Sequence, residues 1–267
     1  PGGRIVRADV DAAATAPATA TAATPAPAAA PSEGESGKGA VTVESLTRLQ
    51  QVIARRMAES RATVPEFTLT TEVDMEAAVA LRAQIKDAGL EGATVPSYND
   101  FVVKACALAL REHPRANGAY KDGAFELYSR VNVGIAVAAQ DALVVPTVFD
   151  ADKRTVGDIA AQTRLLAERV RSGEVTPPEL SGGTFTVSNL GMFGVTEFTA
   201  VINVPQAAIL AVGAMTPRPV VRDGEVVVRN VMAITLSCDH RILYGADAAQ
   251  FLARIRALLE SPLALLV

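Results

Sequence analysis

The sequence has no tryptophan, and all aromatic side chains together make up only 4% of its 267 residues. It has two cysteines, Cys106 and Cys238, and each lies inside an apolar segment. That placement suits buried thiols in a reducing compartment better than a disulfide framework or a metal site. No apolar run approaches the roughly 20 residues that span a bilayer, and residues 1–10 carry no signal-peptide core. These absences predict a soluble protein that holds no metal.

Motifs of several large enzyme classes are also missing. The sequence contains no GxGxxG, no P-loop, no HExxH and no GxSxG, so dinucleotide, nucleotide, zinc-protease and α/β-hydrolase functions lack their signatures. The formal net charge is −4 and basic residues form no patch, which argues against nucleic-acid binding as the main task. No repeat with a period of about 20 to 50 residues occurs, which disfavours solenoids and propellers.

The first forty residues differ in composition from the rest of the chain. Between Asp11 and Pro31 every residue after Asp11 is Ala, Thr or Pro, and small and polar residues continue to Ala40. Such a segment has no large apolar side chain to offset the entropy lost on ordering. Residues 11–40 are therefore predicted to be an extended, flexible linker, between the end of a small domain at 1–10 and a folded domain at 41–267. A cloning artefact or plain low complexity is the alternative.

From residue 41 onward, apolar residues recur with the periods of helices and strands. Helices are predicted at 49–57, 75–88, 101–111, 155–172 and 246–259. Strands are predicted at 67–73, 125–128, 131–138, 143–149, 184–188, 198–202, 207–214, 220–222 and 225–237, with a hairpin turn at 223–224. Hairpins interleaved with single helices, without strict βαβ alternation, predict an α+β fold: a two-layer sandwich with a mixed β-sheet and helices on one face.

The chain has only two histidines. His113 precedes Pro114 at the end of a predicted helix, where an imidazole commonly caps free carbonyl groups, and we interpret it as structural. His240 lies between a long predicted strand and a helix. Connections of this kind often carry function, because a rigid scaffold presents them at a surface. Spacing alone leaves a catalytic and a structural role for His240 equally open.

The segment around His240, DHRILYGADAAQFL, resembles the DHRxxxG signature of the dihydrolipoyl acyltransferases, the core components of 2-oxo-acid dehydrogenase complexes. LTRLQQVIARRMAES resembles the first core helix of that family, and NVGIAVAAQDALVVPTVFDADK resembles its central hairpin. GGTFTVSNLGMFGVTEFTAVINVPQAAILAVG resembles its most recognisable strand pair. The resemblance covers residues 43–267 and implies a chloramphenicol acetyltransferase-like fold. Residues 1–10 also resemble the end of the family's peripheral-subunit-binding domain, which makes residues 11–40 the interdomain linker.

The family implies acyl transfer between dihydrolipoamide and coenzyme A, with the lipoyl group carried on a domain absent from this chain. A thiol has a pKa of ~8.5, so it needs a base to become the attacking thiolate at neutral pH. By resemblance, His240 is that general base. Ser188, in TFTVSNLG, matches the family serine that donates a hydrogen bond to the oxyanion of the intermediate. Without the family match, Ser188 would be read as an ordinary strand-end hydroxyl.

Tyr244 departs from the commonest family pattern. Most members have Asp, and some Asn, four residues after the histidine, paired with an arginine of the first helix, and Arg48 matches that arginine. A phenol cannot form the ion pair, but its oxygen can accept a hydrogen bond from a guanidinium. Tyr244 and SNLGMFGV resemble the plastid and cyanobacterial branch of pyruvate dehydrogenase acetyltransferases, which favours acetyl over succinyl and branched-chain acyl groups. Arg82 matches a cation that some members place near the nucleotide phosphate of coenzyme A; an ordinary solvated arginine is equally compatible.

The resemblance also implies assembly. In the family the histidine of one subunit and the serine of the next meet at a trimer interface, so a homotrimer would be the smallest active unit. The apolar C-terminus, Leu263 to Val267, would join trimers into a cubic or icosahedral shell; folding back onto its own core is the alternative. The partners would be the 2-oxo-acid decarboxylase and dihydrolipoamide dehydrogenase components, in a bacterial cytoplasm or in an organelle stroma or matrix.

Two other functions stay under consideration. A non-catalytic assembly protein could be built on the same core, but it would be expected to lack the base or the oxyanion donor. A diffusible enzyme similar to chloramphenicol acetyltransferase would share the fold and the histidine chemistry, yet it would need no tether. Acyl transfer to dihydrolipoamide but not to chloramphenicol would distinguish a dihydrolipoyl acyltransferase from an enzyme similar to chloramphenicol acetyltransferase.

Overall fold

A computed structural model describes residues 39–89, 92, 94–139 and 142–266. The predictions for residues 1–10 and for most of the linker fall outside these residues. The chain divides into a unit of residues 1–45 and a unit of residues 46–267. All the helices and strands below belong to the second unit.

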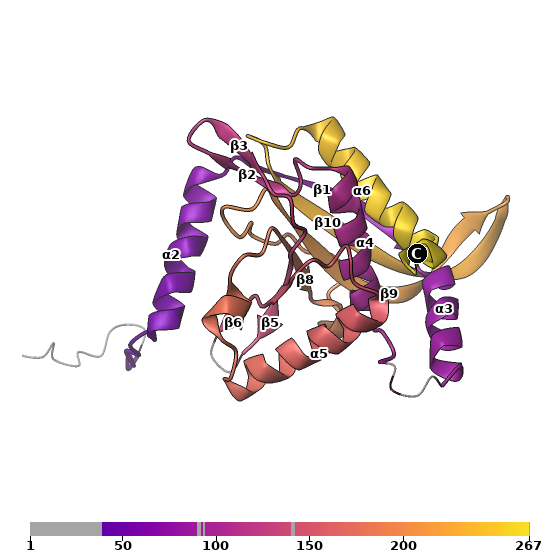
Figure 1. The fold of residues 1–267 in the computed structure, drawn as a ribbon, viewed down its shortest axis with the longest axis horizontal. Coiled ribbons are helices and arrows are strands. Elements are labelled where there is room, and N and C mark those ends of the chain that lie inside the picture. The colour runs from indigo at the N-terminus through magenta and orange to yellow at the C-terminus, as the bar shows by residue number, and fades with distance from the viewer. Residues whose placement is uncertain (1–38, 90–91, 93, 140–141, 267) are drawn as a thin grey trace, which may run out of the picture. The chain divides into compact units, whose positions relative to one another are not determined.

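Five α-helices occur in the described residues, where the apolar periodicity predicts them (Figure 1). The start of the third follows the predicted cap, because Ser97 Oγ accepts from the N–H of Asp100 while the Asp100 carboxylate accepts from the N–H of Ser97. The helices are α2 (Arg48–Thr63), α3 (Glu76–Asp87), α4 (Tyr98–Glu112), α5 (Val156–Ser172) and α6 (Gly245–Glu260). Short 3₁₀ helices are η1 (Pro177–Leu180), η2 (Gly191–Phe193) and η3 (Pro262–Leu265).

A six-stranded mixed sheet lies beneath the helices, in the order β1-β10-β9-β8-β4-β7. The strands β8 and β9 and the strands β8 and β4 are parallel, and the other neighbours are antiparallel. The six strands are β1 (Glu66–Asp74), β4 (Val133–Ile135), β7 (Thr147–Val148), β8 (Phe185–Asn189), β9 (Ala208–Arg222) and β10 (Glu225–Asp239). Two small hairpins pair β2 (Gly118–Lys121) with β3 (Ala124–Leu127) and β5 (Val137–Ala138) with β6 (Leu143–Val144). The mixed sheet confirms the predicted fold class.

The main core lies between α3, α4, α5 and α6 and one face of the sheet. Phe101 of α4, Phe185 of β8 and Phe251 of α6 are fully buried there, and the rings of Phe185 and Phe251 meet edge to face. Both cysteines are also buried in this cluster as free thiols, and burial raises the pKa of each. The prediction of buried thiols is confirmed.

The segment 198–202 is not a strand, which corrects the prediction. Its apolar alternation is real, because Ala200 and Ile202 are buried against the second face of the sheet. However, side chains satisfy its carbonyl groups in place of a neighbouring strand: Ser60 Oγ donates to the Ile202 carbonyl and Ser237 Oγ to the Ala200 carbonyl. The segment therefore covers the sheet without joining it.

The predicted break between the strands 207–214 and 220–222 is also wrong, since β9 is continuous. Pro217 and Pro219 lie within it, where β8 has ended and β9 has only β10 as a neighbour. A proline is tolerated on such an edge, because no neighbour needs its missing N–H. The two strands continue past the end of β1 as a hairpin and turn at Asp223 and Gly224, as predicted (Figure 1).

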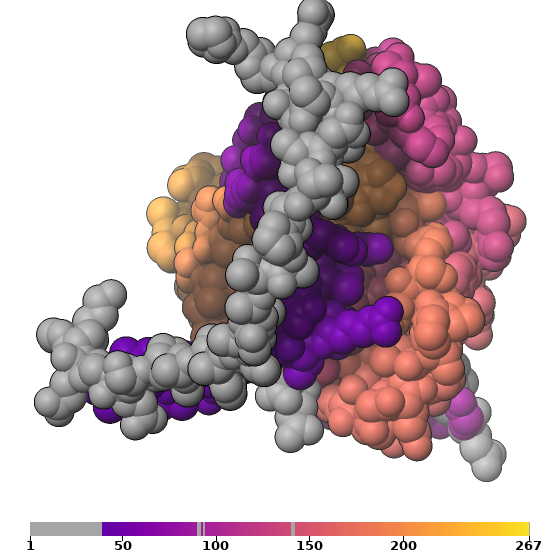
Figure 2. Space-filling model, turned by 90° about the vertical axis from the view of Figure 1, so that its left-hand side faces the viewer, coloured from indigo at the N-terminus to yellow at the C-terminus, as the bar shows by residue number. Residues whose placement is uncertain are grey.

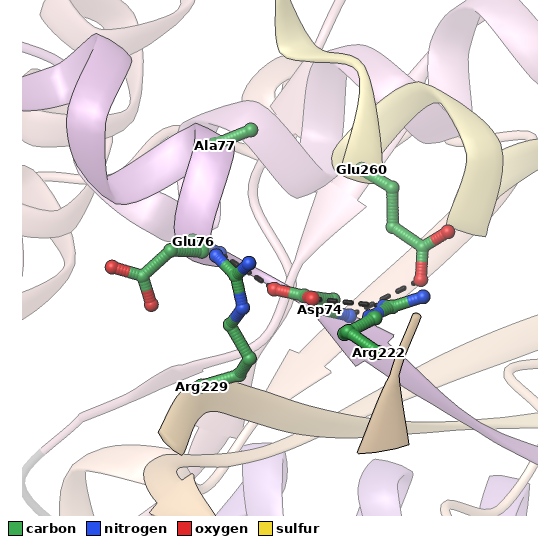
Figure 3. Close-up of a pocket in the computed structure, with 6 residues that line it drawn as sticks. All are labelled: Asp74, Glu76, Ala77, Arg222, Arg229 and Glu260. Atoms are coloured by element: carbon green, nitrogen blue, oxygen red, sulfur yellow. Dashed lines mark hydrogen bonds and ion pairs between the residues drawn. The ribbon is translucent and has the colours of Figure 1, made fainter. Parts of the chain in front are cut away.

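Charged side chains hold this hairpin to the rest of the domain, through Arg222 beside its turn (Figure 3). Arg222 Nη2 lies 2.8 Å from Asp74 Oδ2, and the N–H of Asp74 donates to Glu260 Oε1. Burial acts to raise the pKa of Asp74, but the N–H of Glu76, the Arg222 guanidinium and the charge of Arg229 outweigh it and hold that pKa below its ordinary value of 3.8. The ionised carboxylate is therefore the form that the folded state favours.

Asp74→Asn is expected to lower the free energy of unfolding by about 1 kcal/mol at pH 7, because it removes the ion pair with Arg222. A pKa lower in the folded than in the unfolded chain stabilises the fold above the ordinary value of 3.8, and this contribution is lost as the pH falls through the folded-state pKa. The difference between the two proteins should therefore shrink below about pH 4. Urea unfolding at several pH values measures it. Asp223→Asn, at the tip of the same hairpin, is the control for removing a carboxylate from this part of the fold.

Candidate active site

His240 is the first residue after β10, in the turn that leads into α6. Its N–H donates to the carbonyl of Pro65 at 3.0 Å, which ties the turn to the start of β1. The imidazole is exposed and lies between two rings: its centroid is 4.8 Å from that of Phe67 and 5.9 Å from that of Tyr244. An accessible imidazole on a fixed backbone can take a proton from an incoming group, as a general base must.

The residues on either side of His240 hold the turn in place. The buried Asp239 carboxylate accepts the backbone N–H of Arg241 at 2.9 Å and a bidentate pair from its guanidinium, Nε at 2.9 Å and Nη2 at 2.8 Å. The same guanidinium lies over the Tyr120 ring, 4.6 Å from its centroid. Bidentate pairs of this kind fix direction as well as distance, so the backbone on both sides of the imidazole is constrained.

Ser188 lies near the end of β8, next to the start of α4. The following residue, Asn189, fixes the turn: its Nδ2 donates to Asn99 Oδ1 at 3.0 Å, and its Oδ1 accepts from the N–H of Gly191 at 2.8 Å. Beyond the turn the chain packs closely against β9, where a Cβ added at Gly213 would lie 2.0 Å from the Thr196 carbonyl oxygen. A glycine is required at that position, and the close contact sets the path of the chain after Ser188.

The register of the sheet places Ser188 far from His240 within one chain. Ser188 pairs with Ala211 of β9, and Ala211 pairs with Thr235 of β10. His240 lies five residues beyond Thr235, which is about 17 Å along the strand, and Ser188 lies two strands, or about 10 Å, to the side. The two residues are thus about 20 Å apart. The structure does not bring Ser188 and His240 together, so one chain holds two separate halves of the candidate site.

Arg48 is the first residue of α2, whose other end, Thr63, lies two residues before Pro65. A helix of this length separates its ends by about 22 Å, so Arg48 is remote from the turn that holds His240 and Tyr244. The expected pair of Arg48 and Tyr244 is not formed within the chain. Only Ser60 of α2 is buried, and Figure 2 shows the helix, in indigo and purple, at the surface of the domain.

Arg115 occupies the place beside Tyr244 instead. Its guanidinium carbon lies 5.7 Å from the centroid of the Tyr244 ring and 5.7 Å from that of Phe125 in β3, and its Nη1 lies 3.3 Å from Asp247 Oδ2. No motif or periodicity points to this arginine, because it lies in the turn after α4. Only the packing of that turn, the β2–β3 hairpin and α6 brings the three contacts together.

Arg82 of α3 is half-buried. Its Nε donates to the carbonyl of Pro96 at 2.9 Å, and its guanidinium lies 5.3 Å from the centroid of the Tyr98 ring. Tyr98 precedes Asn99, which contacts the turn after Ser188. Arg82 is therefore a fixed cation near the Ser188 half of the site, although part of its hydrogen-bonding capacity is used within the chain.

Metal-binding and membrane-spanning features were sought in the described part of the chain. There, no group of three or more His, Cys, Asp or Glu side chains is placed to hold a metal ion. None of its helices has the length and apolar character needed to cross a bilayer.

Comparison with known proteins links these features. Residues 38–267 match the family described as 2-oxoacid dehydrogenases acyltransferase (catalytic domain). The chain is 37% identical over 220 residues to the dihydrolipoyllysine-residue acetyltransferase component of the pyruvate dehydrogenase complex of Rickettsia typhi. This alignment covers 82% of the chain and 54% of the relative. The chain thus spans about half the length of the curated relatives it matches.

Solved structures share the fold, and two of them bear on the site. One is the Azotobacter vinelandii dihydrolipoamide acetyltransferase, studied for the role of a serine, a histidine and an asparagine in its catalytic mechanism. It aligns with a TM-score of 0.81 at 33% identity, over 86% of this chain and 96% of that one. The other is the cubic core of the pyruvate dehydrogenase multienzyme complex, with a TM-score of 0.81 at 34% identity, over 86% and 96% of the two chains.

Proposed function

This chain belongs to the 2-oxoacid dehydrogenase acyltransferase family, and from that premise we propose that it transfers an acetyl group between dihydrolipoamide and coenzyme A. The observation that carries the proposal is the placement of His240: an accessible imidazole on a constrained turn, within the family's DHRxxxG motif. The relatives that match most of this chain are acetyltransferases by name, which favours acetyl over other acyl groups.

The proposed reaction uses one base and one hydrogen-bond donor. The His240 imidazole takes the proton from the thiol of the acceptor, and the sulfur attacks the carbonyl carbon of the thioester. The Ser188 hydroxyl donates a hydrogen bond to the oxyanion that forms, and loss of such a donor typically raises the barrier by ~3 to 4 kcal/mol. The intermediate then expels the second thiolate, which takes the proton back from His240. Atoms and charge balance, and the reverse reaction follows the same path.

The distance between Ser188 and His240 favours a site shared by two copies of the chain. At about 20 Å the two side chains cannot act on one carbonyl group within a monomer, whereas His240 of one copy can meet Ser188 of another. Exposed apolar side chains support such an interface, since Met192 and Phe193, just after Ser188, are each 73% exposed. We take a homotrimer as the smallest active unit, with Arg82 near the coenzyme A phosphates.

A larger shell is part of the proposal. One solved relative is a cubic core, and trimers joined across two-fold axes close into such shells. At the C-terminus, Leu265 is buried in its own chain's core, as the alternative interpretation held, while Leu263 and Leu266 are 68% and 51% exposed. Val267 lies outside the described residues. We assign the contact between trimers to the two exposed leucines.

Replacing both Leu263 and Leu266 with serine is expected to release active trimers from the shell, because it removes apolar contacts between trimers and leaves Leu265 in place. Sedimentation with an activity assay on each fraction measures the outcome. Leu265→Ser is the comparison, since it should destabilise the domain itself rather than its assembly. An unchanged shell in the double variant would show that these leucines do not join trimers.

The activity is tested by supplying acetyl-, succinyl- and isobutyryl-coenzyme A with dihydrolipoamide or chloramphenicol as acceptor. Acetyl transfer to dihydrolipoamide alone supports the proposal. Transfer to chloramphenicol would indicate a diffusible antibiotic-modifying type of enzyme, and no transfer at all would indicate an assembly protein. A preference for another acyl group would keep the reaction class and change the substrate.

The setting of the enzyme is likewise proposed. We infer that residues 1–10 end a peripheral-subunit-binding domain, that residues 11–40 are a linker and that residues 41–267 form the catalytic domain. Lipoyl domains, the 2-oxo-acid decarboxylase and dihydrolipoamide dehydrogenase would be its partners. A bacterial cytoplasm fits the bacterial relatives, and an organelle stroma or matrix would fit a eukaryotic source.

A further inference from the structure

The structure assigns to Arg115 the task of holding Tyr244 against the imidazole of His240, a positioning role that rests on the proposed function of His240. Three contacts surround the guanidinium: the rings of Tyr244 and Phe125 and the carboxylate of Asp247. These partners come from the start of α6 and from β3, while Arg115 itself follows α4. Arg115 thus links three elements at one edge of the His240 half of the site.

Tyr244 is an unusual residue for its backbone position. It is the N-cap of α6, where Ser, Thr, Asp or Asn normally accepts a hydrogen bond from the first turn, and its side chain makes no such bond. A residue without such a bond is a poor N-cap and leaves the start of the helix less stable. The ring is directed elsewhere, between Arg115 and His240. The side chain at this position therefore serves the imidazole rather than the helix.

The imidazole itself has few other constraints on its orientation. Phe67 lies on one side of it and Tyr244 on another, and the hydrogen bonds of the turn involve the backbone of His240 and the side chains of its neighbours. If the Tyr244 side chain is free to rotate, the His240 imidazole loses one of the two rings that pack against it. A cation over an aromatic face attracts the ring electrostatically, and the Arg115 guanidinium therefore biases the Tyr244 ring toward one orientation.

The assignment changes the expected partner of an aspartate at position 244. The family pattern suggested that such a carboxylate would pair with Arg48. In this fold it would face Arg115, whose guanidinium already lies beside the residue, whereas Arg48 is at the far end of α2. Arg115 is therefore the cation that contacts the side chain at position 244, whether that side chain belongs to tyrosine or to aspartate.

The test compares Arg115→Met with wild type by two measurements on the full chain. In steady-state acetyl transfer, kcat should fall about tenfold while the KM values for coenzyme A and dihydrolipoamide stay within about twofold, because a base displaced by a fraction of an ångström slows chemistry without weakening binding. In diethyl pyrocarbonate labelling followed by mass spectrometry, His240 should react about threefold faster, because the Tyr244 ring beside it becomes mobile and shields it less. His113 serves as the internal reference.

Two further variants sharpen the labelling result. Tyr244→Phe keeps the ring and should protect His240 as wild type does, whereas Tyr244→Ala should label as fast as Arg115→Met. Arg254→Met is the matched control, since Arg254 also forms a surface ion pair, with Glu112, but has no contact with Tyr244. Its kcat and its labelling should stay at wild-type values.

Three outcomes would overturn the assignment. Unchanged kcat and labelling in Arg115→Met would show that the arginine has no influence on His240. A raised KM with unchanged kcat would show that Arg115 binds substrate directly. Equal losses in Arg254→Met would indicate a general effect of removing surface ion pairs. Because labelling needs no substrate, it tests the assignment even if the chain transfers no acetyl group, and that failure would count against the proposed function alone.

Discussion

His240→Ala is expected to lower the turnover of acetyl transfer by ~10² to 10⁴-fold, the range typical of a lost general base. Without the imidazole, only the small thiolate fraction of the acceptor can attack at neutral pH. The fold should survive, because the side chain is exposed and its ring packs only against those of Phe67 and Tyr244 in the described part of the chain. Steady-state kinetics and thermal unfolding of the same preparation measure both effects.

A variant of the other histidine is the control for this experiment. His113→Gln removes a ring that meets Phe251 edge to face, 5.6 Å away, so it should lower stability slightly and leave turnover within a few-fold of wild type. Raising the pH should partly restore His240→Ala, because more of the acceptor thiol is then ionised. Turnover within a few-fold of wild type at pH 7 would remove His240 from the role of base.

Mixing two inactive variants is expected to restore activity. His240→Ala and Ser188→Ala should each be nearly inactive alone. In trimers assembled at random from equal amounts of both, ~a quarter of the interfaces would combine an intact histidine from one chain with an intact serine from the next. Activity should therefore rise to about a quarter of the wild-type value, because each proposed site takes its two residues from different subunits.

The mixed assembly must be made by co-expression or by joint refolding, so that the chains share trimers. Simple mixing of preassembled variants is the control and should stay inactive. Failure of the co-assembled sample to exceed its two parents would show that Ser188 and His240 act within one chain, or that they do not act together at all. Active monomers in a mass measurement would contradict the shared site in the same way.

Local signals in the sequence predicted most of the helices and strands. The Ser97 cap and the Asp223-Gly224 turn set boundaries through contacts between residues close in the chain, so their outcomes could be foreseen. The segment 198–202 could not, because its alternation of buried and exposed residues is the same whether a neighbouring strand or serine hydroxyls satisfy its carbonyl groups. Pairing partners are a property of the tertiary structure.

In the candidate site, too, features set by local sequence could be predicted and features set by tertiary structure could not. His240 and Ser188 were found through motifs that are continuous in the sequence, whereas their separation required the register of three strands. Arg115 was missed because its contacts come from segments distant in the chain. The expected pairing of Arg48 with Tyr244 rested on family resemblance, and the length of α2 keeps the two apart. The resemblance to the plastid and cyanobacterial branch stays a prediction.

The strand register has a thermodynamic consequence for the proposed enzyme. If each chain folds completely and holds only half of a site, as proposed, its specific activity should follow mass action and fall on dilution below the dissociation constant of the trimer. Spectroscopic signals of the intact sheet would not change over that range. The specific activity would then depend on subunit concentration, whereas the melting temperature would depend on the stability of the folded chain. A diluted sample could therefore lose activity while its melting temperature stays the same.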